Sequence, residues 1–357
     1  MKIGILTFHR ASNYGAVLQT YAINKIIKSL GADVSIVDYR CQEVEESHLP
    51  KYLIKRRGLI KGIIHLPAKI MKFMCFEGFR KRHIITTKKY SRLNIKETAA
   101  EFDKFIVGSD QVWNDKLSGF DTSYLLDFAN HVQKYSYACS FGFSVFPDIY
   151  KKKYLELLKD FRCISVREMS GKNLLAENNL TARVDLDPTL LLSESEWKKL
   201  EQKPQIDKKY ILIYTVNLPV KLLDVARELS KRTGLQIVYL NNEHLANRDI
   251  YHKRYSSPEE FIGFFSNAEY ILTNSFHGTA FSIIFKKKFL VELNTRIKFN
   301  LRSRDFLYEC GLEQCILQDN FDISTFQTVI NWDTVYAHIE NLRKQSLTYL
   351  KKIIYDI

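Results

Sequence analysis

The chain has 357 residues and a mass of 41.9 kDa, and 46% of its residues are hydrophobic, which suits two folded domains and excludes an intrinsically disordered chain. Its longest charge-free run, residues 270–285, is too short for a membrane-spanning helix, and the N-terminus lacks the apolar segment and cleavage site of a signal peptide. The formal net charge is +13, and nearly all of the excess lies between Lys51 and Arg92.

The six cysteines are irregularly spaced and include no C-x-x-C pair. This spacing indicates neither a zinc site nor a disulfide framework. We therefore expect buried thiols and a cytoplasmic location.

The first elements predict a parallel sheet. Residues 2–8 form an apolar run typical of a strand, residues 14–30 have helical spacing and end before Gly31, and residues 32–38 form a second strand. The turn between the first strand and the helix has no dinucleotide or P-loop fingerprint. Ser12 or Asn13 is the candidate cap, and Gly15 allows close approach to the helix N-terminus. The alternative is a capped helix without a ligand.

A basic segment, residues 45–92, interrupts the pattern as a helical insertion. Residues 51–92 contain thirteen Lys and Arg and a single acid, Glu77, interleaved with apolar residues. Such composition favours an anionic membrane surface or another anionic partner. The alternative is a helical insertion that is simply solvated.

A strand at residues 104–108 resumes the sheet and is followed by polar and aromatic residues. Gly108 and Ser109 make the turn, and Asp110, Gln111, Trp113 and Asn114 can hydrogen-bond to a sugar and stack on its ring. The alternative is a loop that buries its own tryptophan.

Arg167 follows a predicted strand at residues 163–166. An arginine at that position can present a bidentate fork to a carboxylate or phosphate. The alternative is an ion pair with Glu168 or another acid. The nearby Asp185-Leu-Asp187 is interpreted as a turn at the domain edge, so no metal is assigned.

The whole pattern predicts two α/β domains in tandem. The predicted divisions are an N-terminal Rossmann-like domain at 1–192, a linker at 193–209, a C-terminal Rossmann-like domain at 210–332, and a helix at 333–357 that packs back on the first domain.

Residues 270–285 read as a strand, a tight turn and a helix, and they contain the best catalytic candidate. His277 falls at the predicted helix N-terminus beside the carboxyl end of a strand. Open α/β sheets bind ligands at that edge, and helix N-termini attract anions. Asn274, Ser275, Gly278 and Thr279 surround the histidine.

Five motifs keep their order along residues 1–310, and together they resemble the polysaccharide pyruvyltransferase family. They are Asn13-Tyr-Gly-Ala with Gln19, Val107-Gly-Ser-Asp-Gln-Val-Trp-Asn114, Ser165-Val-Arg-Glu168, Asp187-Pro-Thr-Leu190 and Thr273-Asn-Ser-Phe-His-Gly278.

The resemblance implies a GT-B-like fold, two Rossmann-type domains facing across a cleft, and transfer of a pyruvyl group from phosphoenolpyruvate to a sugar, forming a ketal. It makes His277 the catalytic residue and Arg167 the donor-binding residue, with phosphoenolpyruvate as co-substrate and no other cofactor. One position departs from the family pattern: Ser275 stands where members often carry arginine. Possible substitutes for that cation are Arg296, Arg302 and Arg304.

The implied acceptor is a sugar of a bacterial capsule, exopolysaccharide or cell wall, or a lipid-linked precursor at the inner face of the cytoplasmic membrane. The motifs specify neither that sugar nor the oligomeric state. Two alternatives stay open: a GT-B glycosyltransferase that uses a nucleotide-sugar, and a non-catalytic polysaccharide-assembly protein. No nucleic-acid-binding motif is present, so we expect no nucleic-acid partner.

Overall fold

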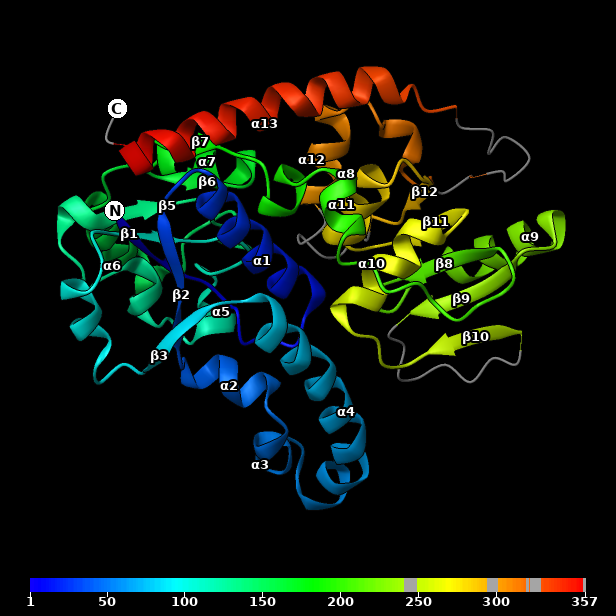
Figure 1. Cartoon of the computed structure of the whole chain (residues 1–357), viewed down its shortest axis with the longest axis horizontal. Coiled ribbons are helices and arrows are strands. Elements are labelled where there is room, and N and C mark those ends of the chain that lie inside the picture. The colour runs from blue at the N-terminus through cyan, green and yellow to red at the C-terminus, as the bar shows by residue number, and fades with distance from the viewer. Residues whose placement is uncertain (241–248, 294–300, 319–320, 322–328, 356–357) are drawn as a thin grey trace. The chain divides into compact units, whose positions relative to one another are not determined.

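The chain divides into two compact units in this computed structural model (Figure 1). Unit 1 comprises Met1–Leu192 and Leu342–Ile357, and unit 2 comprises Ser193–Asn341. The sequence also placed a division after residue 192, but residues 193–209 belong to unit 2 and include a short helix. The structure describes residues 1–240, 249–293, 301–318, 321 and 329–355.

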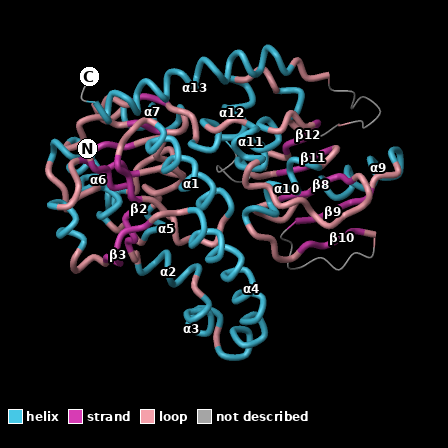
Figure 2. Tube along the Cα trace, in the orientation of Figure 1, coloured by secondary structure: helices cyan, strands magenta, loops and turns pink. Residues whose placement is uncertain are grey.

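Unit 1 is built on a five-stranded parallel sheet in the order β3-β2-β1-β4-β5, bordered by helices (Figure 2). Strands with neighbours on both sides need apolar residues on both faces, and β4 is buried along its whole length. A Cβ added to Gly4 would lie 2.9 Å from the Phe105 ring, so glycine allows β1 and β4 to pack closely. The strands of unit 1 are β1 (Lys2–Leu6), β2 (Asp33–Tyr39), β3 (Thr86–Tyr90), β4 (Lys104–Val107), β5 (Lys134–Ser136) and the separate pair β6 (Ser165–Val166) and β7 (Arg183–Val184).

The helices of unit 1 follow its strands. Helix α1 begins after Asn13, whose side chain accepts a hydrogen bond from the Ala16 N–H at 3.2 Å. The helices are α1 (Tyr14–Ser29), α2 (Gln42–His48), α3 (Leu53–Arg57), α4 (Leu59–His83), α5 (Asp115–Ser118), α6 (Asp148–Lys159) and α7 (Met169–Ala176), with 3-10 turns η1 (Pro50–Tyr52), η2 (Ile95–Ala100), η3 (Thr122–Leu125), η4 (His131–Gln133) and η5 (Pro188–Leu191).

Helices α3 and α4 form a hairpin, called here the basic arm. Gly62 sits where the two helices approach most closely, because a Cβ there would lie 2.8 Å from the Ile54 Cα. The prediction that residues 45–92 are one helical insertion is wrong at its end, since Thr86–Tyr90 is strand β3 of the main sheet. This strand escaped detection because it lies at the sheet edge, where its threonines and lysines are largely solvent-exposed. No helix among the described residues is long and apolar enough to cross a membrane.

Unit 2 repeats the arrangement with the strand order β10-β9-β8-β11-β12, again all parallel. Helix α10 starts with a reciprocal cap: the Glu260 N–H donates to Ser257 Oγ at 3.2 Å, and the Ser257 N–H donates to Glu260 Oε2 at 3.0 Å. The elements are α8 (Glu194–Lys198), β8 (Tyr210–Tyr214), α9 (Leu222–Thr233), β9 (Gln236–Leu240), β10 (Ile250–Lys253), α10 (Pro258–Asn267), β11 (Tyr270–Thr273), α11 (Phe276–Ile284), β12 (Lys288–Val291), α12 (Leu301–Glu309) and η7 (Glu313–Cys315).

The last helix, α13 (Trp332–Tyr355), begins among the residues of unit 2 and ends among those of unit 1. Within unit 2, the Tyr336 hydroxyl donates to the Ile284 carbonyl at 2.6 Å. Within unit 1, Lys104 Nζ donates to the Ile353 carbonyl at 2.6 Å. The sequence assigned the whole tail from residue 333 to the first domain, whereas the structure assigns only the part from Leu342 onward to unit 1.

Candidate functional site

His277 occupies the first turn of α11, directly after the carboxyl end of β11. The N-cap is Ser275, whose Oγ accepts a hydrogen bond from the Gly278 N–H at 3.3 Å, and this cap starts the helix two residues before the histidine. His277 is 8% exposed, so most of the imidazole is enclosed by protein. The predicted strand, turn and helix are therefore all present, with the histidine at a helix N-terminus.

The other predicted residues of this segment build the turn itself. Asn274 accepts from the Val216 N–H at 2.9 Å and donates to the Asn217 carbonyl at 3.0 Å. The Ser275 N–H and the Thr279 hydroxyl also make internal hydrogen bonds. A Cβ added to Gly278 would lie 2.1 Å from Thr273 Oγ1, so only glycine fits. These four residues hold His277 in place, and a role in contacting substrate stays a prediction.

A cation from the next helix lies beside this turn. The Arg302 guanidinium is 5.9 Å from the centre of the Phe276 ring, and that ring is 5.3 Å from the His277 ring. Arg304 instead donates to its neighbour Asp305 at 3.0 Å. Arg296 lies outside the described residues. Of the cations suggested to replace the arginine absent at 275, Arg302 is the one that the structure places near the histidine.

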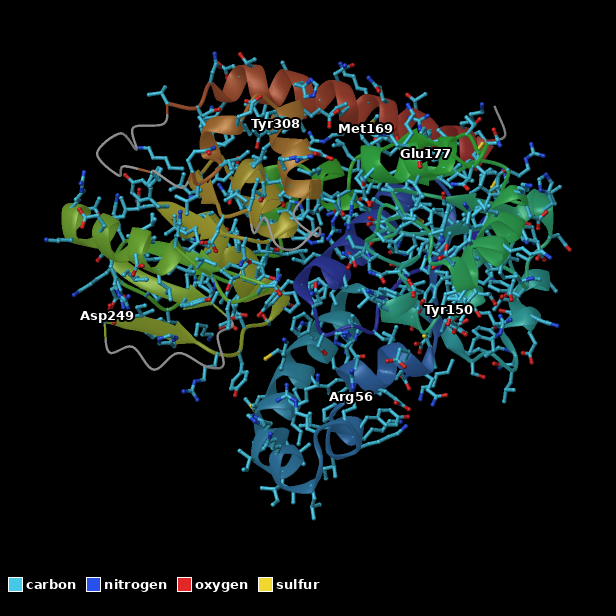
Figure 3. All side chains as sticks on the ribbon, turned by 180° about the vertical axis from the view of Figure 1, so that it is seen from behind. Arg56, Tyr150, Met169, Glu177, Asp249 and Tyr308 are labelled. Carbon is cyan, nitrogen blue, oxygen red and sulfur yellow. The ribbon has the colours of Figure 1, made fainter. Side chains whose placement is uncertain are left out.

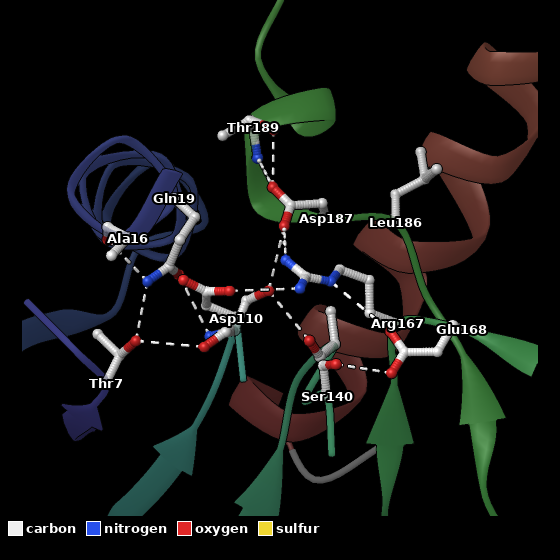
Figure 4. A network of polar contacts seen from close by, with 12 residues as sticks. Thr7, Ala16, Gln19, Asp110, Ser140, Arg167, Glu168, Leu186, Asp187 and Thr189 are labelled. Carbon is white, nitrogen blue, oxygen red and sulfur yellow. Dashed lines mark hydrogen bonds and ion pairs between the residues drawn. The ribbon is translucent and has the colours of Figure 1, made fainter. Parts of the chain in front are cut away.

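The first turn of unit 1 is connected to the turn after β4 through Gln19 (Figure 4). The Gln19 amide donates to Thr7 Oγ1 at 2.8 Å and accepts from the Ser109 N–H at 3.2 Å. The Ser109 hydroxyl donates to the Ala138 carbonyl at 3.0 Å. Gly15 is buried at the start of α1. Gln19 and Ser109 are thus fully buried connectors between α1 and the sheet.

Arg167 lies at the centre of a buried charge network (Figure 4). Its guanidinium donates to Asp187 Oδ2 at 2.6 Å and to Asp110 Oδ1 at 3.4 Å, and it lies 3.8 Å from Glu168 Oε2. Burial alone would lower the pKa of Arg167, but the three carboxylates outweigh burial and raise that pKa. The guanidinium is therefore a permanent cation that is 2% exposed and paired inside unit 1. Arg167 therefore forms the ion pairs of the alternative interpretation, and its guanidinium is not an open fork for a carboxylate or phosphate ligand.

Trp113 is also in the core. It is 1% exposed, its indole N–H donates to the Tyr124 carbonyl at 2.9 Å, and its ring packs against Phe141. The neighbouring Gln111 side chain accepts from Asn114 at 2.8 Å. The loop thus buries its own tryptophan, as the alternative interpretation predicted. A ring that is enclosed on all sides has no face on which a sugar can stack.

The comparisons with known proteins assign the family. The model of one family, polysaccharide pyruvyl transferase, matches residues 13–294. The chain belongs to this family. A search of curated protein sequences found no match for this member of the family.

Solved structures show the fold of this family member. The UDP-GlcNAc 2-epimerase of Methanocaldococcus jannaschii superposes with a TM-score of 0.51 at 14% identity, over 96% of this chain and 93% of that chain. S. aureus MnaA, solved with UDP, gives 0.50 at 13% identity, over 98% and 90%. An alpha-glucosyltransferase, solved with UDP and DNA, gives 0.50 at 10% identity, over 99% and 95%. At these identities the likeness shows the fold alone, and that fold is GT-B.

The structure thus separates the predicted site residues into two groups. His277, Asn274, Ser275, Gly278 and Thr279 come together in unit 2. The group in unit 1 contains Asn13, Gly15, Gln19, Ser109, Asp110, Gln111, Trp113 and Arg167.

One buried pair was missed from the sequence. His9 Nε2 lies 3.0 Å from Asp38 Oδ1, at the carboxyl ends of the adjacent strands β1 and β2. Burial acts to raise the pKa of Asp38, but hydrogen bonds from His9 and Arg40 outweigh it and hold that pKa at about 2. Both residues follow apolar runs in the sequence. This shared position near the end of a predicted strand is the signal from which the pair could have been predicted.

Proposed function

We propose that the chain transfers a pyruvyl group from phosphoenolpyruvate to a sugar of a bacterial surface polysaccharide or of its lipid-linked precursor, forming a cyclic ketal. The observation that carries the proposal is the position of His277 at the capped N-terminus of α11, in a chain that belongs to the polysaccharide pyruvyl transferase family. An imidazole at that position can act as a general acid on an anionic donor.

In the proposed reaction, the His277 imidazolium gives a proton to the methylene carbon of phosphoenolpyruvate, while a sugar hydroxyl adds to the enol carbon and releases its own proton. The carbon–oxygen bond to phosphate then breaks and phosphate leaves. A second hydroxyl of the sugar forms the remaining bond of the ketal. Of the two protons that the hydroxyls lose, one restores the His277 imidazolium and the other leaves with the phosphate. General acid catalysis of this kind contributes about 10² to 10⁴ in rate.

The donor carries a carboxylate and a phosphate, so the proposed site needs positive potential. Two features of unit 2 supply it: the N-terminal end of α11 and the Arg302 guanidinium beside Phe276. We assign to Arg302 the role of the arginine that family members often carry where this chain has Ser275. Arginine suits this role because its planar fork can bind a carboxylate or phosphate through two hydrogen bonds.

We give Arg167 an indirect role. Its guanidinium is enclosed by three carboxylates, and an anionic donor would have to displace Asp187 to reach it. Asp110, by contrast, has a partly exposed side chain and is hydrogen-bonded to Arg167. Arg167 therefore fixes the orientation of Asp110 and is a positioning residue of the turn after β4.

The test is phosphate release from phosphoenolpyruvate by the purified chain with a panel of nitrophenyl and lipid-linked sugars. The proposal predicts release that requires an acceptor and a sugar product that gains a pyruvyl ketal by mass spectrometry. A nucleotide-sugar glycosyltransferase would instead be thermally stabilised by uridine diphosphate and not by phosphoenolpyruvate. A non-catalytic assembly protein would release no phosphate with any acceptor.

The basic arm supports a peripheral membrane location for this reaction. Its exposed apolar side chains recur at three- and four-residue spacing along α4 and therefore share one helix face. Lysines and arginines accompany them, and Figure 3 shows Arg56 on the arm. An amphipathic helix with this composition suits an anionic bilayer surface. The large exposed apolar residues of the arm are Ile54, Leu59, Ile60, Ile63, Ile64, Ile70, Met71 and Met74.

Flotation with anionic liposomes tests the role of the arm. The double variant Ile60→Ser and Ile64→Ser removes two exposed side chains from the apolar face and should abolish flotation. The matched control is Ile149→Ser on α6, which removes an isoleucine outside the arm that is more exposed than either test residue. Charge reversal of Arg56 and Arg57 should weaken flotation in a salt-dependent way. Unchanged flotation of both arm variants would leave the arm as a solvated insertion.

A further inference from the structure

Unit 1 contains a cavity of about 430 Å³ that has no part in the reaction described above. Four elements enclose it: the segment after β1, the end of β2, the last turns of α4, and β3. The cavity therefore opens at the carboxyl edge of the sheet, where α/β proteins bind ligands. Its lining residues are His9, Arg10, Asp38, Arg40, Glu77, Arg80, Lys81, Ile84, Thr86 and Lys89.

The lining is strongly cationic. Five lysines and arginines face two carboxylates, Asp38 and Glu77. Two of the three arginines donate to these carboxylates: Arg40 donates to Asp38 at 2.7 Å, and Arg80 donates to Glu77 at 2.8 Å. Within the described part of the chain, Lys81 and Lys89 have no ion-pair partner. Glu45, outside the lining, also pairs with Arg40 at 3.1 Å. The five cations of the lining therefore outnumber the carboxylates around them, and the excess charge is that of the solvent-exposed Lys81 and Lys89.

Arg10 is the least satisfied of the three arginines. Its nearest carboxylate oxygens belong to Glu45 and Glu77, at 3.7 and 3.6 Å, which is beyond hydrogen-bond distance. Its Nε atom is buried and has no hydrogen-bond partner among the described residues, and the same is true of the Arg40 Nε atom. Buried N–H groups of an arginine are normally hydrogen-bonded, because an unmet donor is costly. In the part of the chain that the structure describes, the Arg10 guanidinium is therefore held only by two long ion pairs.

The arginines also repel one another. Burial lowers the pKa of Arg80, and the positive charges of Arg10 and Arg40 act in the same direction. A ligand with more than one negative charge would reduce this repulsion. Phosphate suits such a site, since its tetrahedral oxygens match the guanidinium fork and its negative charge at neutral pH is between one and two.

A purely structural ion-pair network is the competing explanation. It accounts for Arg40 with Asp38 and for Arg80 with Glu77, which are at hydrogen-bond distance. It includes Arg10 only through the long ion pairs with Glu45 and Glu77, and it does not account for the open volume or for the additional lysines. The cavity therefore fits a ligand better than a completed network.

We propose that this cavity is a binding site for a phosphate or diphosphate group. The site is independent of the donor site assigned to unit 2, because all its lining residues belong to unit 1. Two sources can supply the same chemistry: a free phosphate, or the diphosphate of a lipid-linked molecule. The second source has support in the fold, because α4 carries both the cavity residues in its last turns and the exposed apolar face of the basic arm in its earlier turns.

Isothermal titration calorimetry of the full chain distinguishes these sources with three probes: inorganic phosphate, pyrophosphate and farnesyl diphosphate. The test variants are Arg10→Gln and Lys89→Gln. The control is Lys88→Gln, because Lys88 is the neighbour of Lys89 on β3 but lies outside the cavity, 3.4 Å from Glu97. Melting temperatures of all variants verify folding, and Arg10→Gln removes no hydrogen bond of the described structure.

The expected result is saturable binding of at least one probe, weakened about tenfold or more by Arg10→Gln and unchanged by Lys88→Gln, since a hydrogen bond to a charged group supports an effect of that size. Tighter binding of farnesyl diphosphate than of pyrophosphate assigns the site to a lipid diphosphate, and equal binding assigns it to a free anion. Absence of binding by all three probes, or equal binding by the Arg10→Gln and Lys88→Gln variants, overturns the proposal. Binding should persist in His277→Ala, so a failed donor assignment in unit 2 would not remove it.

Discussion

The turn after β4 and the turn after β11 occupy equivalent places in the two sheets, because each follows the fourth strand in its sheet order. Both depend on a glycine that leaves no space for a Cβ: at Gly108 the Cβ would lie 2.1 Å from the Tyr137 carbonyl oxygen, and at Gly278 it would lie 2.1 Å from Thr273 Oγ1. Beyond that, their chemistry differs. The first turn supplies Asp110, one of the three carboxylates around the buried Arg167, whereas the second starts a helix that carries His277.

From this difference we propose that the first turn mainly serves stability and that its counterpart mainly serves chemistry. In unit 1 every strong charge around the turn has a partner within the unit, so the turn is locked by long-range ion pairs. In unit 2, Ser275 and Thr279 make short-range hydrogen bonds within the turn, and Asn274 adds a bond to the Asn217 carbonyl, 57 residues away. These bonds involve no charged side chain, and they position a titratable ring. The account therefore predicts that variants of the first turn mainly lose stability and variants of the second mainly lose activity.

The largest expected effect is that of His277→Ala on turnover. Loss of the general acid should lower kcat for pyruvyl transfer by about 10² to 10⁴ while the melting temperature changes little. Steady-state phosphate release and thermal unfolding measure the two quantities. The control is His252→Ala, which removes another histidine of unit 2 that stacks on Tyr239. Wild-type turnover by the His277 variant would remove this residue from catalysis.

Arg167→Met should have the largest effect on stability. It keeps the length of the side chain but leaves Asp187 buried without its cation, which costs about 3 to 5 kcal/mol of unfolding free energy. Urea unfolding measures the loss. Arg227→Met breaks an exposed pair with Asp249 and should cost less than about 1 kcal/mol. In a double-mutant cycle, adding Asp187→Asn should recover part of the unfolding free energy that Arg167→Met loses. If the losses of the two single variants simply add, the two side chains are not coupled.

Gly278→Ala should have a smaller effect that combines both losses. The added methyl group collides with Thr273 Oγ1, so the turn must shift, and overpacking of this kind costs about 1 to 3 kcal/mol. Because the same shift displaces His277, kcat should fall as well. Gly171→Ala is the control, since its Cβ would meet only ordinary contacts at 3.5 Å or more. Equal behaviour of the two alanine variants would show that the turn after β11 is not tightly constrained.

The smallest expected effect is a pH dependence of stability that arises from His48, the last residue of α2. Burial, and then the charges of Lys69, Lys72, Arg80 and Arg56, lower the pKa of His48 to about 3. Its folded pKa is below its unfolded value of about 6.5, so its contribution to stability is complete above that pH and is lost as the pH falls toward 3. Urea unfolding between pH 7 and 4.5 should show a smaller loss for His48→Gln than for wild type. Equal losses of unfolding free energy in His48→Gln and wild type would exclude His48 as the cause of the pH dependence.

The sequence was sufficient for features that depend on neighbouring residues. The apolar run 270–273 followed by Ser275 predicted a strand, a capped turn and a helix, and all are present. The GT-B fold was likewise expected from the motifs and is shown by the structural comparison. Strand β3 was missed because a polar strand at a sheet edge has no apolar alternation to reveal it.

Other features depend on residues that are distant in the sequence. Arg167 is paired with Asp187 and Asp110, which are 20 and 57 residues away, and local pattern alone gave equal support to an open fork and a buried pair. Trp113 presents the same problem, since burial of a loop tryptophan is decided by tertiary packing. The cationic cavity combines four segments between residues 9 and 89, so its presence was not evident from any one motif.

The most direct test of the account places His277→Ala and Arg167→Met in one experiment, at a temperature at which both variants are folded by circular dichroism. Single-turnover transfer from phosphoenolpyruvate to an acceptor is measured for each variant with saturating donor. The account predicts that His277→Ala loses about 10² or more in rate with nearly wild-type stability, and that Arg167→Met loses stability but retains most of its rate. The opposite pattern, with the rate lost in Arg167→Met and kept in His277→Ala, would contradict it.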